Sequence, residues 1–349
     1  MTGYNLVKEK ISRLYYPKEK YPPLPTILMI EPTNVCNLKC SMCYVQQHIK
    51  TGIFLSLIDF EKIINQFPLI RELIFCGIGE PLLNKHIFEM INIAKNKRVG
   101  FINLFTNGKL LNTEMAEKIV KSGIDRIQIS VHSFNVDIFT KVRNEDVPCL
   151  EELKQNIRQF VAIRKELNRS LKVCCNAVVT KFNYNDLLAF INEAKDLGID
   201  RIEFFQMTTA NDKLKDINAP LSSMPQIARE ARRLAGRLNI ELGFLNGNEY
   251  GRCYQLWDFI MIHADGTVSP CNGIFPTENI GVGNILRSPI EQIWNSEKYQ
   301  QLRQLVKEGK LKYCKYCESG YCMEGRNLMW LKNYYVRPIK RWIRSVYAR

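Results

Sequence analysis

The sequence lacks any apolar run long enough to cross a membrane. Its longest apolar stretches, such as residues 25–30 and 72–75, have only the length of a β-strand, whereas a membrane-spanning helix needs about 20 apolar residues. The first 20 residues also lack the apolar core and small-residue cleavage site of a signal peptide. We therefore expect a cytoplasmic protein that does not span a membrane.

Internal repeats and low-complexity segments are absent as well. With 349 residues, of which 46% are hydrophobic and 24% charged, the chain can bury a full core. This length suggests one large domain with a smaller one appended, and a globular enzyme is the expected class. The net charge is +14, but the Lys and Arg residues are dispersed along the chain. Dispersed charge indicates a solvated surface, so we expect no nucleic-acid partner.

From residue 26 to about 243, short β-branched runs alternate with longer amphipathic segments, as in repeated βα units around a parallel sheet. The predicted strands span residues 26–31, 71–76, 101–105, 126–130, 172–179 and 201–206. The predicted helices span residues 57–66, 84–95, 113–122, 150–167 and 184–197, and Ser56 and Asn112 are helix-start signals. The predicted fold class is α/β, a partial (β/α)6 TIM-type barrel. Function then belongs to the loops that follow the strands.

The pattern changes after residue 240, and a Gly- and Asn-rich linker follows. Beyond it we expect a hairpin at Asp265-Gly266 and a helix near residues 290–307. The predicted division is an N-terminal extension at 1–25, the barrel at 26–243, an appended domain at 244–326 and a basic aromatic tail at 327–349.

The chain contains 12 cysteines, and a reducing compartment favours metal ligation, redox chemistry or burial over disulfides. Cys36, Cys40 and Cys43 share one short loop after the first predicted strand. Three thiolates at this spacing can bind three corners of a [4Fe-4S] cluster and leave one iron open. Zinc is the competing interpretation, but a structural zinc site prefers four protein ligands, and only His48 follows closely.

The spacing Cys36-x3-Cys40-x2-Cys43, with Gly79-Glu80-Pro81 after the second predicted strand, resembles the radical S-adenosylmethionine (SAM) superfamily. The resemblance covers about residues 26–243. It implies that SAM chelates the open iron and that an electron from a donor such as flavodoxin or ferredoxin cleaves it. The resulting 5′-deoxyadenosyl radical would then remove a hydrogen atom from the substrate.

The same resemblance suggests SAM-binding residues. The Glu80 carboxylate and the carbonyl groups of Ile78 and Gly79 can accept hydrogen bonds from the SAM ammonium group, and a glycine lets the backbone approach closely. Ser130, at the end of the fourth predicted strand, matches a position that contacts the SAM ribose or carboxylate. Asn107 lies in the adjoining loop, and an Asn-Gly turn explains it equally well.

Met42 precedes the third cysteine, where this family usually has an aromatic residue near the adenine, so the resemblance makes Met42 a candidate contact of SAM.

Five later cysteines resemble those of the SPASM and twitch extensions of radical SAM enzymes. The segment around one of them, His263-Ala-Asp-Gly-Thr-Val-Ser-Pro-Cys271, resembles these extensions as well. A full SPASM extension uses seven cysteines for two clusters. Five favour one auxiliary [4Fe-4S] cluster, and a zinc ribbon is the alternative. The expected ligands are Cys253, Cys271, Cys314 and Cys317. Cys322 is left over, as a further ligand or as a free thiol that donates a hydrogen atom to the substrate.

The tail at 327–349 is rich in aromatic, Lys and Arg residues and contains no Asp or Glu. Such a segment can touch an anionic membrane surface peripherally, or dock on the barrel.

The leading functional hypothesis is an oxidoreductase or epimerase acting on a polar small molecule, such as a sugar, aminocyclitol or glycoconjugate precursor. It follows from the resemblance to enzymes with a single auxiliary cluster. The alternative is a SPASM-type enzyme that modifies a peptide or protein. Only about 25 residues precede the first predicted strand, too few for a leader-binding domain. An electron-transfer protein without SAM chemistry is disfavoured by Gly79-Glu80-Pro81.

Overall fold

The computed structural model describes residues 22–43, 51–167, 170–206, 217, 224–243, 255–272, 281–308 and 310–311. These residues form one ten-stranded sheet with the strand order β10-β9-β8-β1-β2-β3-β4-β5-β6-β7. The strands are β1 (Ile27–Ile30), β2 (Glu72–Phe75), β3 (Ile102–Thr106), β4 (Arg126–Ser130), β5 (Lys172–Val179), β6 (Arg201–Gln206), β7 (Glu241–Gly243), β8 (Phe259–Ile262), β9 (Thr267–Ser269) and β10 (Gly283–Asn284).

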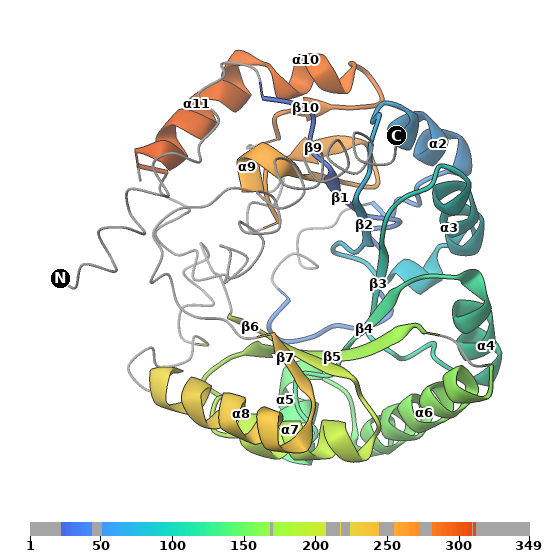
Figure 1. The fold of residues 1–349 in the computed structure, drawn as a ribbon, viewed down its shortest axis with the longest axis vertical. Helices are drawn as coiled ribbons and strands as arrows, with labels where there is room; N and C mark the ends of the chain where they lie inside the picture. The colour runs from blue at the N-terminus through green and yellow to red at the C-terminus, as the bar shows by residue number, and fades with distance from the viewer. Residues whose placement is uncertain are drawn as a thin grey trace, which may run out of the picture.

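Strands β1 to β7 are parallel, as expected for successive βα units. Their crossover helices lie on the outer side of the curved sheet (Figure 1). These helices are α2 (Leu57–Asn65), α3 (Ile87–Asn96), α4 (Thr113–Ser122), α5 (Val136–Arg143), α6 (Val147–Glu166), α7 (Leu187–Asp196) and α8 (Met224–Leu238). A short 3-10 helix, η2 (Pro81–Leu83), precedes α3. The architecture is the predicted α/β partial barrel.

The six predicted strands are confirmed to within one residue at each end. Two predicted helix starts are confirmed by their capping bonds. The Ser56 hydroxyl accepts from the backbone N–H of Asp59 at 3.1 Å, and the Asn112 side chain accepts from Met115 N–H at 2.9 Å. Local signals therefore placed these elements correctly.

Several elements of the structure were not predicted. Helix α5, capped by Asn135, has eight residues, too few to display a clear helical repeat. Helix α8 and the three-residue strand β7 were also not predicted. The helix predicted from residue 84 begins at Ile87 because η2 comes first, and the helix predicted from residue 150 begins at Val147.

The predicted appended domain continues the sheet of the barrel. Strand β8 pairs in parallel with β1, with Ile27 opposite Phe259. The Asp258 carboxylate accepts from Thr26 N–H at 3.1 Å and from its hydroxyl at 2.7 Å, and it pairs with Arg71 at 2.8 Å. The boundary between barrel and appended domain stays a prediction, but strand β8, beyond that boundary, belongs to the same sheet.

The predicted hairpin at Asp265-Gly266 is confirmed between β8 and β9, and Gly266 has a φ of 81°. The expected helix near 290–307 is instead two helices. These are α10 (Ile290–Trp294) and α11 (Glu297–Lys307), which follow the hairpin. Ser296 separates them, because its hydroxyl caps α11 by accepting from Tyr299 N–H at 3.3 Å. A further short helix, α9 (Gln255–Asp258), precedes β8.

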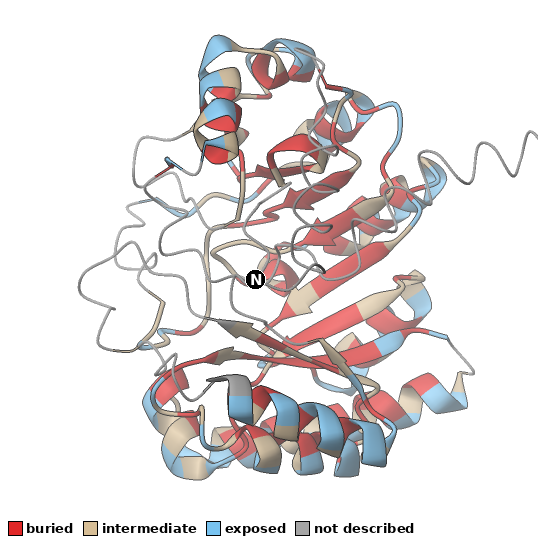
Figure 2. Ribbon diagram, turned by 60° about the vertical axis from the view of Figure 1, so that its left-hand side comes forward, coloured by how far each residue is buried: buried red, intermediate tan, exposed pale blue. Residues whose placement is uncertain are grey.

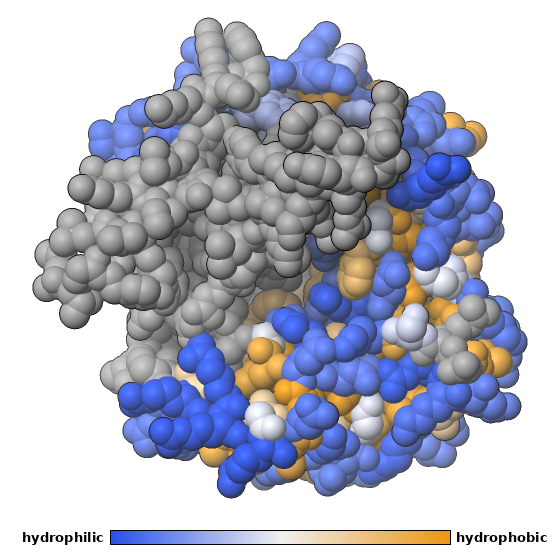
Figure 3. Space-filling model, in the orientation of Figure 1, coloured by the Kyte–Doolittle hydropathy of each residue, from blue (hydrophilic) through white to orange (hydrophobic). Residues whose placement is uncertain are grey.

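The main hydrophobic core fills the space between sheet and helices, and Figure 2 shows the strands largely buried. A smaller apolar cluster lies on the opposite, inner face of the sheet and includes Met29, Ile74 and Met261. Figure 3 shows a hydrophilic margin over α6, α7 and α8, with apolar atoms mainly inward of them. Over the described residues, no helix has both the length and the apolar character needed to cross a bilayer.

Adjacent cysteines in β5 illustrate the two faces. Cys175 belongs to the main core, so the pleat directs Cys174 to the inner face. Both side chains are fully buried, and burial raises the pKa of Cys174 to about 12. A thiol with so high a pKa stays protonated, as expected for a small buried residue.

Candidate active site

Cys36, Cys40 and Cys43 lie in the loop that follows β1, and all three are half-buried. The loop turns where Cys43 N–H donates to the Cys40 carbonyl at 3.0 Å. Ser41 anchors it to the end of α5, because its N–H donates to the Val142 carbonyl at 3.0 Å and its hydroxyl to the Lys141 carbonyl at 2.7 Å. The three thiols thus belong to a short loop that is held by its own turn and by the hydrogen bonds of Ser41 to the end of α5.

Burial disfavours the thiolate form of two of these residues, Cys36 and Cys40. Burial raises the pKa of Cys36, while the Leu38 N–H and the Asn107 side chain partly offset the rise. Burial likewise raises the pKa of Cys40 to about 12, against the lowering effect of the Arg143 cation. Thiolates at Cys36 and Cys40 therefore need cationic partners, which the iron atoms of a cluster would supply.

Among the described residues, no three His, Cys, Asp or Glu side chains gather as the ligands of a single metal ion would. A cuboidal cluster makes a different demand, because each thiolate binds a different iron. Three thiols spaced along one loop fit that demand. The assignment of Cys36, Cys40 and Cys43 as the ligands of such a cluster stays a prediction.

Gly79 allows the loop after β2 to pack directly on the segment before the cysteines. A Cβ atom at this position would lie 2.3 Å from the Thr33 carbonyl oxygen and 2.4 Å from that of Val35. The next residue, Glu80, donates its N–H to the Val35 carbonyl at 2.8 Å. Backbone meets backbone here, so no larger residue fits without moving the loop.

The Glu80 carboxylate is buried and joins the loops after β2 and β3. One oxygen accepts from Asn107 N–H at 2.7 Å and the other from Leu82 N–H at 3.2 Å. Burial raises the pKa of Glu80, and hydrogen bonds from Asn107, Thr106 and Leu82 partly offset this. Among the described residues, these contacts of the carboxylate are with the protein's own backbone. Its expected contact with the SAM ammonium group stays a prediction, as does that of Gly79.

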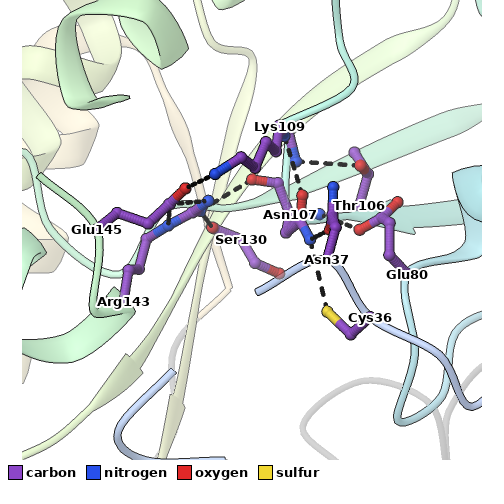
Figure 4. A network of polar contacts seen from close by, with 10 residues as sticks. Cys36, Asn37, Glu80, Thr106, Asn107, Lys109, Ser130, Arg143 and Glu145 are labelled. Carbon is purple, nitrogen blue, oxygen red and sulfur yellow. Dashed lines mark hydrogen bonds and ion pairs between the residues drawn. The ribbon is translucent and has the colours of Figure 1, made fainter. Parts of the chain in front are cut away.

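Asn107 is both a turn residue and a neighbour of the cysteine loop, as Figure 4 shows. Its side-chain oxygen accepts from Lys109 N–H at 2.9 Å, and Gly108 has a φ of 80°, so the Asn-Gly turn is confirmed. Its side-chain amide also donates to Asn37 Oδ1 at 2.7 Å and to Cys36 Sγ at 3.7 Å. A hydrogen bond to a ligand sulfur tunes the potential of a cluster.

Arg143, which the sequence did not single out, is a buried residue of this network and lies beside Glu145 (Figure 4). It donates to the carbonyl groups of Asn107 at 2.8 Å and Ser130 at 2.5 Å. Glu145 pairs with it at 2.8 Å and also with Lys109 at 2.8 Å. A basic residue in the last turn of a helix is ordinary, so its sequence position gave no signal.

Ser130 ends β4 and is half-buried, and Met42 is half-buried in the cysteine loop. Their SAM contacts stay predictions.

Cys271 follows β9, where it is half-buried and packs against the main core. Several predicted elements lie outside the described residues, namely Cys253, Cys314, Cys317, Cys322 and the tail at 327–349.

We expect Glu80→Ala to lower thermal stability and to weaken SAM binding. The change leaves the N–H groups of Asn107 and Leu82 without their buried acceptor, at a cost of about 1 to 3 kcal/mol. Scanning calorimetry and titration calorimetry of reconstituted protein measure the two effects. Both clusters should still assemble, because no metal ligand is removed. Loss of iron from this variant would contradict the expectation.

Comparison with known families agrees with this geometry. The model described as the radical SAM superfamily matches residues 30–194, and the iron-sulfur cluster-binding SPASM model matches residues 253–318. The chain belongs to the radical SAM superfamily. It is therefore an enzyme whose cofactors are SAM, the SAM-binding [4Fe-4S] cluster and an auxiliary iron-sulfur cluster. The predicted superfamily and the predicted SPASM-like extension are confirmed.

The relatives include two curated proteins of similar length. The chain is 26% identical over 318 residues to the tungsten-containing aldehyde ferredoxin oxidoreductase cofactor-modifying protein of Pyrococcus furiosus, covering 83% of this chain and 86% of that protein. It is 25% identical over 287 residues to the PqqA peptide cyclase of Granulibacter bethesdensis, covering 78% and 74%.

Among solved structures, SuiB of Streptococcus suis bound to S-adenosylmethionine is similar, with a TM-score of 0.68 and 17% identity. The match covers 90% of this chain and 76% of SuiB. At this identity the similarity concerns the fold, and it confirms the partial barrel.

Proposed function

We propose that this radical SAM enzyme modifies a peptide or protein substrate. The observation that carries the proposal is the similarity to the PqqA peptide cyclase, which extends over 78% of the chain. The SPASM match at residues 253–318 adds to it. These similarities favour the peptide alternative over the sugar or aminocyclitol that the count of five cysteines favoured.

When bound, SAM and its cluster would supply radical chemistry that begins with removal of a hydrogen atom from the substrate. The chain's own residues position the reactants. Glu80 joins the loops after β2 and β3, and Arg143 holds the carbonyl groups of Asn107 and Ser130. An electron from a flavodoxin- or ferredoxin-like donor and peripheral contact of the tail with membranes stay predictions.

The inner face of the sheet offers groups that suit a peptide. Gln128 lies between Ile127 and Ile129, which belong to the main core, so its side chain is on the inner face. Asn103 on β3 is placed in the same way. Both are buried, and their side-chain carbonyl oxygens have no hydrogen-bond partner among the described residues. A peptide N–H can supply the missing donor, since an unpaired buried acceptor is costly.

The test compares substrates under one assay. Reconstituted enzyme, SAM and a reductant are incubated anaerobically with short peptides encoded beside its gene, or with sugars and aminocyclitols. We expect a peptide to stimulate deoxyadenosine formation and to change in mass or stereochemistry. Loss of two hydrogen atoms would indicate oxidation or crosslinking, and inversion without mass change would indicate epimerisation. Stimulation and product formation with a small molecule alone would reject the peptide proposal.

The variant Gln128→Leu sharpens the test, because it preserves volume but removes the unpaired carbonyl oxygen on the inner face. Deoxyadenosine formation without substrate should be unchanged, while the peptide concentration needed for half-maximal stimulation should rise about tenfold. Lys118→Gln on the exposed face of α4 is the control, since Lys118 pairs with Glu114 on the same helix, away from the inner face of the sheet.

A further inference from the structure

Glu31 is a buried carboxylate between the SAM-motif loop and the appended domain. It follows β1 directly and is 2% exposed. Its backbone N–H donates to the carbonyl of Ile262 in β8 at 2.9 Å. The side chain therefore lies at the carboxyl end of β1, where the cysteine loop begins. At this point the barrel sheet continues into the appended domain through β8.

One carboxylate oxygen of Glu31 holds the loop that contains Gly79 and Glu80. Its Oε1 atom accepts from Ile78 N–H at 2.5 Å. The loop also covers the side chain closely, because a Cβ atom on Gly77 would lie 2.5 Å from Glu31 Cγ. In a trans peptide the N–H and the preceding carbonyl point in opposite directions. Fixing Ile78 N–H on Glu31 thus directs the Gly77 carbonyl away from Glu31 and fixes the adjoining peptide planes.

The other oxygen holds the hairpin between β8 and β9. Glu31 Oε2 accepts from Ala264 N–H at 3.2 Å and lies 3.5 Å from His263 Nδ1. The opposite ring nitrogen of His263 lies 2.8 Å from the hydroxyl of Ser269. The strand that contains Ser269 leads directly to Cys271, the described member of the predicted auxiliary-cluster ligands.

We propose that Glu31 is a positioning residue that couples the SAM-binding loop to the hairpin of the auxiliary-cluster domain. Both of its backbone partners are N–H donors, one on each oxygen, so the position requires two acceptors. A carboxylate supplies them, whereas the amide of glutamine has one acceptor and one donor. The coupling does not depend on the class of substrate.

The matched variants are Glu31→Gln and Asp258→Asn. Asp258 also joins β1 to the appended domain, through Thr26 and Arg71, but at the other end of β1, far from the SAM loop. Glu31→Gln preserves the volume of the side chain. Its NH2 group would face either Ile78 N–H or Ala264 N–H, so that two donors would meet without an acceptor. We expect both variants to lose some thermal stability, and we expect only Glu31→Gln to weaken SAM binding.

SAM affinity is measured by titration calorimetry of the full-length, cluster-loaded protein, and the change of the cluster's electron paramagnetic resonance spectrum on adding SAM gives a second readout. Glu31→Gln should raise the SAM dissociation constant about tenfold or more with its iron content unchanged. In Asp258→Asn the SAM affinity and the spectral change should match the parent protein. Equal SAM affinity in Glu31→Gln and the parent overturns the proposal.

A milder variant covers the case in which Glu31→Gln does not fold or load its clusters. Ala264 is the second residue of the turn closed by Gly266 N–H on the His263 carbonyl at 2.9 Å, a position that tolerates proline. Ala264→Pro removes the hairpin's donor and leaves the Ile78 contact in place. Coupling predicts a smaller but measurable loss of SAM affinity and an altered spectrum on adding SAM. Parent-like values for both would reject the coupling.

Discussion

Replacing Cys36, Cys40 and Cys43 together with alanine will abolish SAM cleavage and remove about half of the bound iron, four atoms of about eight. The physical reason is that these thiols are the predicted ligands of the cluster that transfers the electron to SAM. The auxiliary cluster lies in a separate segment of the chain, matched by the SPASM model at 253–318, so it should remain. Iron analysis and chromatographic detection of deoxyadenosine measure the two outcomes.

Cys149→Ala is the matched control for the triple variant. Cys149 is a half-buried cysteine in the first turn of α6, outside both predicted ligand sets. Its variant should keep the parent's iron content and rate of deoxyadenosine formation. Undiminished SAM cleavage by the triple variant would disprove the assignment of these cysteines.

Gly79→Ala will weaken SAM binding about tenfold or more, or prevent the site from assembling. The added Cβ would lie 2.3 Å and 2.4 Å from the carbonyl oxygens of Thr33 and Val35. Both oxygens belong to the backbone of the segment that precedes Cys36. Backbone atoms cannot rotate away as the end of a side chain can. Relieving the overlap must shift the loop or the cysteine segment, at a cost of about 1 to 3 kcal/mol. Titration with SAM and thermal denaturation measure these effects.

Gly236→Ala provides the control for the same chemical change. Gly236 lies within α8, and a Cβ there meets nothing within 4 Å. Because glycine is a poor helix former, alanine should stabilise the protein by up to about 1 kcal/mol and leave SAM affinity unaltered. Parent-like SAM binding by Gly79→Ala would show that the close backbone approach is not required.

The fold could be read well where local signals were strong. The six predicted strands are β-branched runs between amphipathic segments, and Ser56 and Asn112 cap the helices they were expected to cap. Helix α5 escaped detection because two turns contain too few positions to show periodicity. That omission mattered, since α5 anchors Ser41 and ends in Arg143, the buried cation of the site.

The substrate hypothesis rested on a cysteine count, which constrains clusters but not what enters the barrel. The leading small-molecule interpretation is the weaker of the two after comparison, since the PqqA peptide cyclase is similar over most of the chain. In the proposed function, Asn103 and Gln128 contact the substrate, and strand register sets the inner-face position of both side chains.

The sequence by itself determined the superfamily, the positions of six barrel strands and the loop that contains Cys36, Cys40 and Cys43, because each depends on the pattern of a few neighbouring residues. Only the tertiary structure decided which polar groups meet. Asn107 reaches Cys36 across 71 residues, and Glu31 reaches Ala264 across 233. Such pairs are fixed by the register of parallel strands and by burial, which require each donor to face an acceptor. No local pattern in the chain encodes those distances.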